Sequence, residues 1–178
     1  NIDLEGFKSI TIPSLFNVKQ ENDMETAMDT IFEAADIAIE NGYNIIILSD
    51  KGVDKDKAPI PALLVASGLH HHLIRKGTRM KVSIVLESGE PREVHHFACL
   101  VGYGVNGINP YMAYEAIKEL SDEKLLEYSY EDGVKRFNKA CTKGIVKIMS
   151  KMGISTIQSY QGAQIFEALG ISESVVNK

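Results

Sequence analysis

The chain has 178 residues, a length that predicts one domain and allows a buried hydrophobic core without disulfides or metal ions. Hydrophobic residues make up 44% and charged residues 24%, which excludes a disordered tail, a collagen-like fibre and a small disulfide scaffold. The net charge of −5 predicts no binding to nucleic acid or to an anionic membrane, because both require a positive field.

The sequence also indicates a compartment. Apolar runs such as residues 45–48 and 97–101 are far shorter than the roughly 20 residues of a membrane-spanning helix. Cys99 and Cys141 lie in apolar segments, which is typical of reduced thiols in a cytoplasmic protein. Because the chain begins with Asn1 and not with Met, we expect a piece of a longer polypeptide or a trimmed chain.

Strand-like and helix-like patterns alternate from the N-terminus. A β-rich run at 9–13 comes first. A capping-box pattern at Asn22 then predicts a helix that runs through Ile39 and stops at Gly42. The apolar run at 44–49 does not alternate with polar residues, which is typical of a parallel strand buried on both faces.

The alternation continues to the C-terminus. After a polar loop at 50–57 we expect a helix from Pro59 to Gly77, a strand at 81–87, a helix at 92–101, a strand at 105–109, a helix at 111–120, an acidic connector, a long helix ending at Met152, a strand at 154–157 and a helix to Leu169. Repeated strand–helix units without hairpin turns predict an α/β fold with a parallel sheet, either barrel-like or open and doubly wound. A complete eight-unit barrel needs about 250 residues, so a barrel here would be incomplete. Because no linker-like segment interrupts residues 1–178, we predict a single domain.

The segment from Gly102 to Gly107 matches the G-x-G-x-x-G pattern of dinucleotide-binding proteins. That site needs a strand before the glycines and a helix directly after them. Here a helix is predicted before the glycines, and residues 108–110 separate them from the next helix. We therefore interpret the segment as a helix C-cap followed by a tight turn into a strand.

All five histidines fall into two clusters, at 70–72 and 95–96. His95 and Cys99 are four residues apart, so on a helix they share a face and offer two ligands for a metal ion. No Cys-x-x-Cys or His-Glu-x-x-His pattern accompanies the clusters. We prefer the interpretation in which the histidines hydrogen-bond to neighbouring strands and loops, and the metal site remains an alternative.

Polar side chains also follow the predicted strands, where parallel α/β proteins build their sites: Asp50, Glu87, Glu90 and Asn109. Arg92, His95 and His96 begin the helix after the third strand, and a helix N-terminus favours an anion. We predict no catalytic residue. The candidates for anion binding or for an interface are Glu87, Arg92, His95, His96 and Asn109.

Lysines recur at every fourth position from Lys135 to Lys151 on the long predicted helix. Like charges at this spacing cost about 0.2–0.5 kcal/mol per pair. Two interpretations are open. We prefer a solvated helix face balanced by the nearby acidic connector, and the other interpretation is a docking face for an acidic partner.

Several long strings in the chain resemble the large subunit of glutamate synthase. They are APIPALL at 58–64, HHHLIRKG at 70–77, the run from Ser83 through ESGE and REVHHFA to Ala98, GYG at 102–104 with NPY at 109–111, MSKMGIST at 149–156 and QSYQGAQIFE at 158–167. The similarity covers roughly residues 45–170, and strings of this length are far more specific than a short motif.

The resemblance implies that the chain is the later part of the family's central domain. That domain joins the glutamine amidotransferase domain to the FMN-binding barrel and is similar to the barrel in topology. The parent enzyme hydrolyses glutamine, passes ammonia to 2-oxoglutarate and reduces the adduct to a second glutamate. Its electrons come from NAD(P)H or ferredoxin through an iron–sulfur cluster and FMN.

The residues that carry these chemistries in the family have no counterpart here. Residue 1 is Asn instead of a nucleophilic cysteine, and the glycine- and serine-rich flavin segment is missing. Two isolated cysteines cannot supply a cysteine-ligated cluster. The resemblance therefore implies a structural connector without a cofactor of its own, whose partners are the amidotransferase and FMN-binding domains of the parent. The alternative is an autonomous α/β domain that binds a small anion or a metal.

Overall fold

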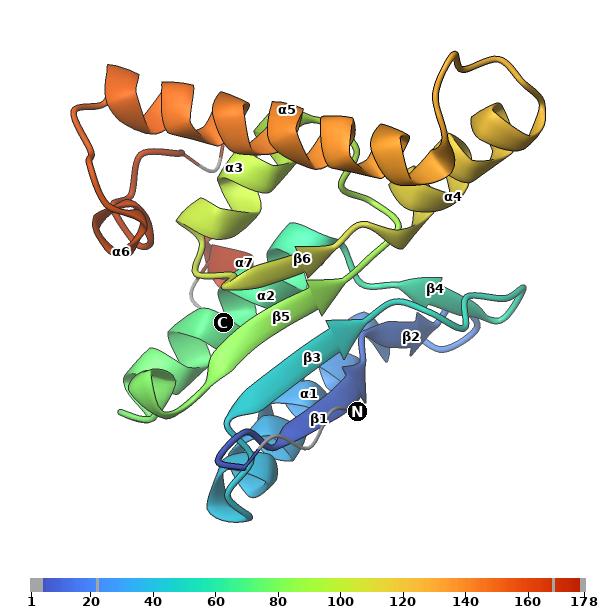
Figure 1. Cartoon of the computed structure of the whole chain (residues 1–178). Helices are drawn as coiled ribbons and strands as arrows, with labels where there is room; N and C mark the ends of the chain where they lie inside the picture. The colour runs from blue at the N-terminus through green and yellow to red at the C-terminus, as the bar shows by residue number, and fades with distance from the viewer. Residues whose placement is uncertain (1–4, 22, 168, 177–178) are drawn as a thin grey trace.

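A computed structural model of the protein describes residues 5–21, 23–167 and 169–176. Its main sheet contains four parallel strands in the order β1-β3-β5-β6, which confirms the predicted parallel α/β fold (Figure 1). The strands are β1 (Ser9–Pro13), β3 (Ile45–Ser49), β5 (Ser83–Glu87) and β6 (Gly107–Asn109). All four coincide with predicted strands, although β5 and β6 begin two residues later because the turn η1 (Arg79–Lys81) and the residues after α3 precede them.

Helices connect consecutive strands of this sheet. They are α1 (Asp23–Glu40), α2 (Ala62–Arg75) and α3 (Val94–Gly102). Because the strand order follows the chain and such crossovers are right-handed, these helices belong on one side of the sheet. Figure 1 shows α1 and α2 behind the strands, with no helix in front of them in the described part of the chain.

The hydrophobic core lies between the sheet and these helices. Every second residue of the central strands is buried there, including Ile46, Leu48, Ile84 and Leu86, each at most 1% exposed. The apolar side of α2 meets them through residues such as Leu69. The intervening strand residues, apart from the buried Ser49, are only partly buried, so this parallel sheet has one fully packed face and one more open face.

The register places polar residues side by side at the carboxyl end of the open face. Ser49 pairs with Glu87, and Glu87 pairs with Asn109. Successive residues of a strand point to opposite faces, so these three side chains share the open face. Three strands thus bring their last residues to one edge, and the candidate site is built there.

A second, two-stranded sheet was not predicted. The strand β2 (Leu15–Asn17) pairs antiparallel with β4 (Lys57–Pro59). The prediction that a helix begins at Pro59 is therefore wrong: Pro59 ends β4, and α2 begins at Ala62. Strands of three residues are too short to show a period-2 pattern, and only the tertiary fold brings β2 and β4 together.

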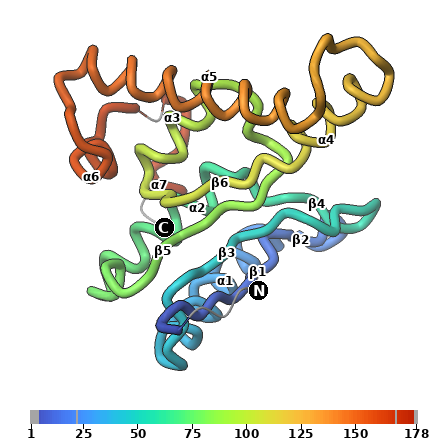
Figure 2. The backbone as a smooth tube through the Cα atoms, in the orientation of Figure 1, coloured from blue at the N-terminus to red at the C-terminus, as the bar shows by residue number. Residues whose placement is uncertain are grey.

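The remaining helices follow β6 in the chain. They are α4 (Tyr111–Asp122) and α5 (Tyr130–Lys151), followed by the short α6 (Ile157–Tyr160) and α7 (Glu173–Val176). The backbone trace shows α5 running along the outer edge of the molecule across α3 and α4 (Figure 2). The Ser129 hydroxyl accepts a hydrogen bond from the Asp132 N–H and so caps the start of α5.

The predicted strand at 154–157 and helix to Leu169 are wrong. Thr156 caps the single turn α6 by accepting a hydrogen bond from the Ser159 N–H, so the segment is committed to a helical turn. Gly162 and Gln164 then adopt positive φ angles, which no helix continues through. The main sheet has four parallel strands within the described residues, instead of the five that the sequence predicted.

Other predictions have separate outcomes. The Asn22 cap lies outside the described residues. The interpretation of the glycine pattern is confirmed, because α3 ends at Gly102, Gly104 has φ +96°, and β6 follows at Gly107. No helix in the described ranges has the length and apolar character needed to cross a bilayer.

Candidate functional site

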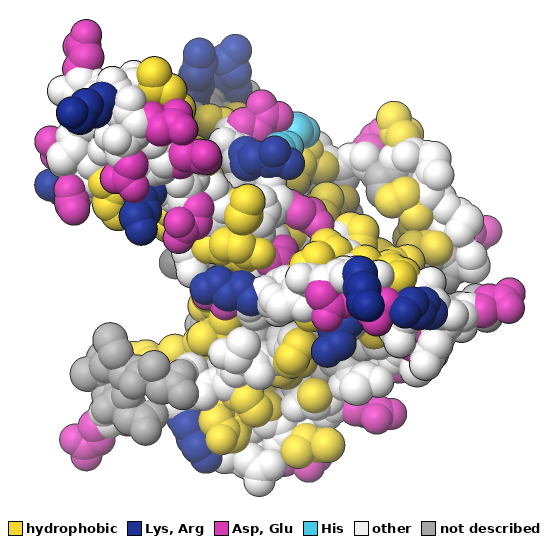
Figure 3. Space-filling model, turned by 90° about the vertical axis from the view of Figure 1, so that its right-hand side faces the viewer, with side chains coloured by type: hydrophobic (Ala, Val, Ile, Leu, Met, Phe, Trp, Pro, Cys, Tyr) yellow, Lys and Arg dark blue, Asp and Glu magenta, His cyan; other side chains and the backbone are white. Residues whose placement is uncertain are grey.

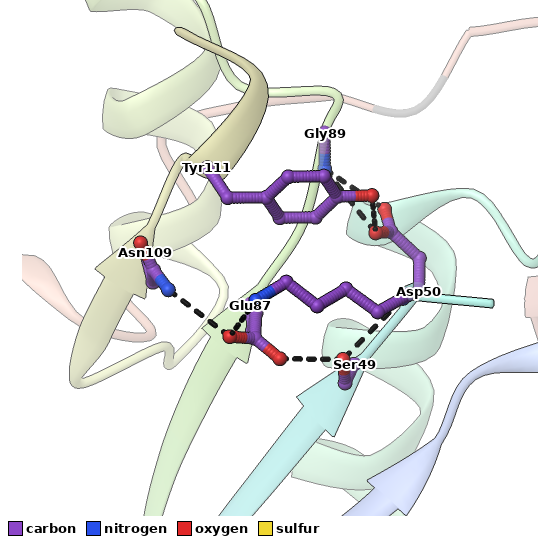
Figure 4. Close-up of polar contacts among 7 residues, drawn as sticks. Ser49, Asp50, Glu87, Gly89, Asn109 and Tyr111 are labelled. Atoms are coloured by element: carbon purple, nitrogen blue, oxygen red, sulfur yellow. Dashed lines mark hydrogen bonds and ion pairs between the residues drawn. The ribbon is translucent and has the colours of Figure 1, made fainter. Parts of the chain in front are cut away.

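Glu87 lies at the centre of a polar network at the carboxyl edge of the sheet (Figure 4). Its Oε2 accepts a hydrogen bond from the Ser49 hydroxyl at 2.7 Å. Its Oε1 accepts from Lys51 Nζ at 2.9 Å and from Asn109 Nδ2 at 3.1 Å. Burial alone would raise the pKa of Glu87, but these hydrogen bonds and the charge of Lys51 outweigh burial, so the pKa lies below its usual value.

Asp50 forms a second, deeper part of the same edge. The side chain is 4% exposed and directly follows β3. It accepts hydrogen bonds from the Ser88 hydroxyl at 2.6 Å, the Gly89 N–H at 3.0 Å and the Tyr111 hydroxyl at 2.7 Å. Burial, together with the bond to Asp50 and the nearby negative charges, raises the pKa of Tyr111 to about 12.

The carboxylates of Asp50 and Glu87 therefore accept their hydrogen bonds from donors within the chain. Each has hydrogen bonds on both oxygens, and the Lys51 ammonium is paired with Glu87. Such a network fixes the ends of β3, β5 and β6 relative to one another, because breaking one bond leaves a partly buried acceptor unsatisfied. It leaves no free acid, base or cation aimed at a ligand.

Arg92, His95 and His96 line a different place, a groove of about 490 Å³ beside the N-terminal ends of α2 and α3. Glu90 forms part of its wall, and its Oε2 accepts a hydrogen bond from the Ala62 N–H at 3.1 Å. The structure thus separates the five predicted residues into two sets. Glu87 and Asn109 belong to the carboxyl-edge network, whereas the other three line the groove.

The groove also contains Cys99. Its sulfur lies 3.6 Å from Nε2 of His95, which confirms that the two side chains share one face of α3. Burial raises the pKa of the Cys99 thiol, so the reactive thiolate is disfavoured. The His95 and Phe166 rings are nearly perpendicular, with their centroids 5.7 Å apart.

The histidine clusters are engaged by neighbours within the chain. Nδ1 of His70 accepts a hydrogen bond from Arg79 Nε at 2.8 Å. Burial, then the charge of Arg79 and the neighbouring His71, lowers the pKa of His70 to about 4. Nε2 of His72 lies 3.0 Å from a carboxylate oxygen of Asp36. Among the described residues, no three His, Cys, Asp or Glu side chains come together as a metal site.

Sequence reasoning missed several members of the carboxyl-edge network. Ser49, Lys51 and Tyr111 were not singled out, although Ser49 ends β3 and Tyr111 follows β6 after one proline. For Ser49 and Tyr111 the available signal was their position at the end of a buried strand or just after one. Lys51 gave no such signal, because only the folded loop directs its side chain back to Glu87.

Comparison with known proteins places the chain in a family. The family model for the glutamate synthase central domain matches residues 1–172. The chain belongs to the glutamate synthase central-domain family. This confirms the predicted resemblance, and the full chain is 51% identical to the large chain of the NADPH-dependent glutamate synthase of Bacillus subtilis.

Other relatives of this central-domain segment are named for other electron donors. The NADH glutamate synthase of Schizosaccharomyces pombe is 44% identical over 85% of the chain. The ferredoxin-dependent glutamate synthase of Pyropia yezoensis is 40% identical over 94% of the chain. The segment spans only 12%, 7% and 12% of the length of these three relatives.

Solved structures show what the central-domain segment resembles in fold. It is similar to the flavin-binding domain of baker's yeast flavocytochrome b2, with a TM-score of 0.54, 17% identity, and coverage of 82% of this chain and 37% of that one. A flavocytochrome b2 mutant with sulfite bound gives a TM-score of 0.57 at 15% identity, covering 95% and 40% of the two chains. The likeness confirms a barrel-like arrangement of βα units that is not closed within the described residues.

The carboxyl edge of this segment does not fit FMN, and its cysteines do not fit an iron–sulfur cluster, the two cofactors that its family implies. The carboxyl edge presents the acids Asp50 and Glu87, and Lys51 is already paired there, so the phosphate of FMN would meet negative charge. Cys99 and Cys141 are the only thiols in the sequence and lie on different helices. An iron–sulfur cluster needs about four such ligands.

Proposed function

We propose that the segment is a structural connector in a glutamate synthase, which forms two glutamate molecules from glutamine, 2-oxoglutarate and a reductant. In this role it holds the amidotransferase domain and the FMN-binding domain in register, and carries no catalytic residue itself. The observation that carries the proposal is the carboxyl-edge network, in which the chain's own donors occupy both carboxylates. A rigid edge without a free reactive group suits a spacer between two active sites.

The position of the segment within its relatives supports the same role. Its whole length matches a central domain, yet it spans 12% of the Bacillus subtilis large chain. FMN and the iron–sulfur cluster then belong to other parts of the parent. The two free cysteines are consistent with a cytoplasmic enzyme of nitrogen assimilation.

Activity assays of the purified 178-residue chain test this proposal. We expect no ammonia release from glutamine and no glutamate formation from 2-oxoglutarate above the protein-free blank, even with FMN and a reductant added. The Bacillus subtilis large chain, assayed in parallel for ammonia release, shows that the conditions support hydrolysis. Turnover by the chain that persists through repeated purification would refute the connector role.

A second candidate function is binding of a small anion in the groove beside α2 and α3. The observation that favours it is the convergence of Arg92, His95 and His96 on one groove of about 490 Å³. A guanidinium and two imidazoles suit a carboxylate or phosphate group.

Titration of FMN fluorescence, and calorimetry with 2-oxoglutarate, separate the two functions. If the groove binds anions, quenching or heat saturates, and Arg92→Ala weakens binding about tenfold or more, as loss of a charged hydrogen bond predicts. The control Lys81→Ala removes an exposed charge that does not line the groove and should leave binding unchanged. Unchanged fluorescence and no heat would exclude anion binding in the groove and leave the connector role as the only proposed function.

A further inference from the structure

Helix α5 carries positive charge that its own surroundings do not balance. The chain has a net charge of −5, yet residues 133–166 contain six basic residues and no acidic one. Five of the six are the lysines at every fourth position from Lys135 to Lys151, and all five are exposed. Each step of four residues advances about 6 Å along a helix, so the row is a continuous basic ridge. We call this ridge, together with Val146, the outer face of α5.

Only one end of this ridge is neutralised. Nζ of Lys135 lies 3.6 Å from a carboxylate oxygen of Asp132. Within the described ranges, Lys139, Lys143 and Lys147 form no ion pair. Repulsion between neighbours at this spacing opposes helix formation, so an isolated outer face is unfavourable and a negative surface against it would stabilise α5.

The opposite side of α5 is already used. Helix α5 packs on α3 and α4 (Figure 2), and its residues Cys141 and Met149 are buried. On the outer face, by contrast, Val146 is 57% exposed between Lys143 and Lys147. An apolar side chain within a charged rim matches the arrangement of a protein–protein contact.

A second copy of this segment fits the outer face poorly. Antiparallel pairing of two α5 helices about a two-fold axis would place the central lysines of one copy against those of the other. Acidic residues gather instead on α4 and the connector after it, including Glu115, Glu119, Asp122 and Glu123, at the end of the molecule that faces the viewer in Figure 3. Pairing that region with α5 of a second copy is the competing arrangement, and the coupling experiment below would detect it as links to a second molecule.

Phosphate-rich polymers are disfavoured too. A nucleic acid or an anionic membrane extends beyond the ridge and would meet the remainder of the chain. The net charge of −5 means that the remainder repels it. A compact acidic protein surface avoids this repulsion. The chemistry of the ridge therefore selects carboxylates presented by folded protein.

We propose that the outer face of α5 docks against an acidic surface of the same full-length synthase polypeptide, outside residues 1–178. This inference rests on the proposed connector function, since the segment spans 12% of a relative's length and most of such a parent lies elsewhere. Lys139, Lys143 and Lys147 supply the charge, and Val146 the apolar contact.

Lysine footprinting of the full-length polypeptide tests the docking. Lys139, Lys143 and Lys147 should be acetylated about tenfold more slowly than the exposed controls Lys55 and Lys81, as expected for amines that must leave an ion pair. The protection should disappear at about 1 M salt, where the screening length is about 3 Å. Equal rates for both sets of lysines would overturn the proposal.

Zero-length coupling of amines to carboxylates identifies what docks on the outer face of α5 in the same full-length polypeptide, which is treated with nuclease first. We expect links from these lysines to Asp or Glu outside residues 1–178 of the same molecule, and their loss in a variant with Lys139→Glu, Lys143→Glu and Lys147→Glu. The matched control, Lys55→Glu with Lys81→Glu, should keep them. Links to a second molecule, or protection without any carboxylate link, would overturn the proposal.

The two proposals fail separately. The connector function is judged by the activity of the 178-residue chain, whereas the docking surface is judged by lysine reactivity in the full-length polypeptide. A silent segment whose α5 lysines react freely would keep the first proposal and remove the second.

Discussion

Tyr111 donates a hydrogen bond from its hydroxyl to Oδ1 of Asp50 at 2.7 Å, and Lys51 lies with Nζ 5.1 Å from the centre of the Tyr111 ring. One tyrosine therefore contacts both charged parts of the carboxyl-edge network. Asp50 is 4% exposed, so a donor lost from its carboxylate is replaced by water only with difficulty. The stability of this edge depends on single side chains.

Replacing Tyr111 with Phe tests this dependence. We expect Tyr111→Phe to lower the free energy of unfolding by about 1–2 kcal/mol, because a carboxylate loses one donor. Tyr114→Phe is the matched control. Its hydroxyl donates to Asn138 at an exposed site, and the change should stay within about 0.5 kcal/mol. Urea unfolding measures both, and equal small effects would show that the network does not stabilise the fold.

At the scale of elements, the turn from α3 to β6 depends on a close contact with α2. Gly104 has φ +96°, and a Cβ added there would lie 2.1 Å from Nδ1 of His70. His70 is in turn held by Arg79, whose guanidinium also donates to the Gly104 carbonyl at 2.7 Å. Three segments thus lock one another at the amino end of the sheet.

Gly104→Ala should therefore be more damaging than another alanine at positive φ. We expect a loss of about 2–4 kcal/mol in the free energy of unfolding, from the left-handed backbone and the clash together. Gly42→Ala is the control, because Gly42 has φ +79° with nothing within 4 Å of the added Cβ. It should cost about 1–2 kcal/mol. Similar losses in thermal or urea unfolding would mean that His70 moves aside freely.

Long elements were predictable from the sequence and short ones were not. The buried strands β3 and β5 and the long helix α5 have apolar patterns that extend over several residues, and the structure confirms them. The β-rich residues 154–157 were predicted as a strand, but the local Thr156 cap outweighs their propensity. The carboxyl-edge network was predictable only in part, because strand ends can be placed from sequence but the side chain of Lys51 cannot.

At the scale of the whole molecule, the C-terminal segment is attached to the sheet domain through α3. Tyr160 is fully buried, and its hydroxyl donates to the Ala98 carbonyl at 2.9 Å. The Gly162 N–H donates to the Gly102 carbonyl at 2.8 Å, and Gln161 Nε2 donates to the Val105 carbonyl at 3.0 Å. These contacts join residues about sixty positions apart and favour a single cooperative unit.

Cooperative unfolding tests the prediction of a single domain. Far-UV circular dichroism and tyrosine fluorescence should give one coincident urea transition. Tyr160→Ala should lower the free energy of unfolding measured by both probes by about 3–5 kcal/mol, whereas Tyr160→Phe, which keeps the ring, should cost about 1 kcal/mol. If Tyr160→Ala changed only a separate minor transition, the C-terminal segment would be an independent unit.

The sequence by itself determined the parallel α/β class and the family, and it holds too few cysteines for an iron–sulfur cluster. Apolar runs, long family-specific strings and the count of two cysteines are properties that need no three-dimensional contact to be read. The tertiary structure alone decided that Glu87 and Asn109 lie together while Arg92, His95 and His96 line another groove. Strand register and helix packing bring together side chains that are distant along the chain, and no local pattern encodes those distances.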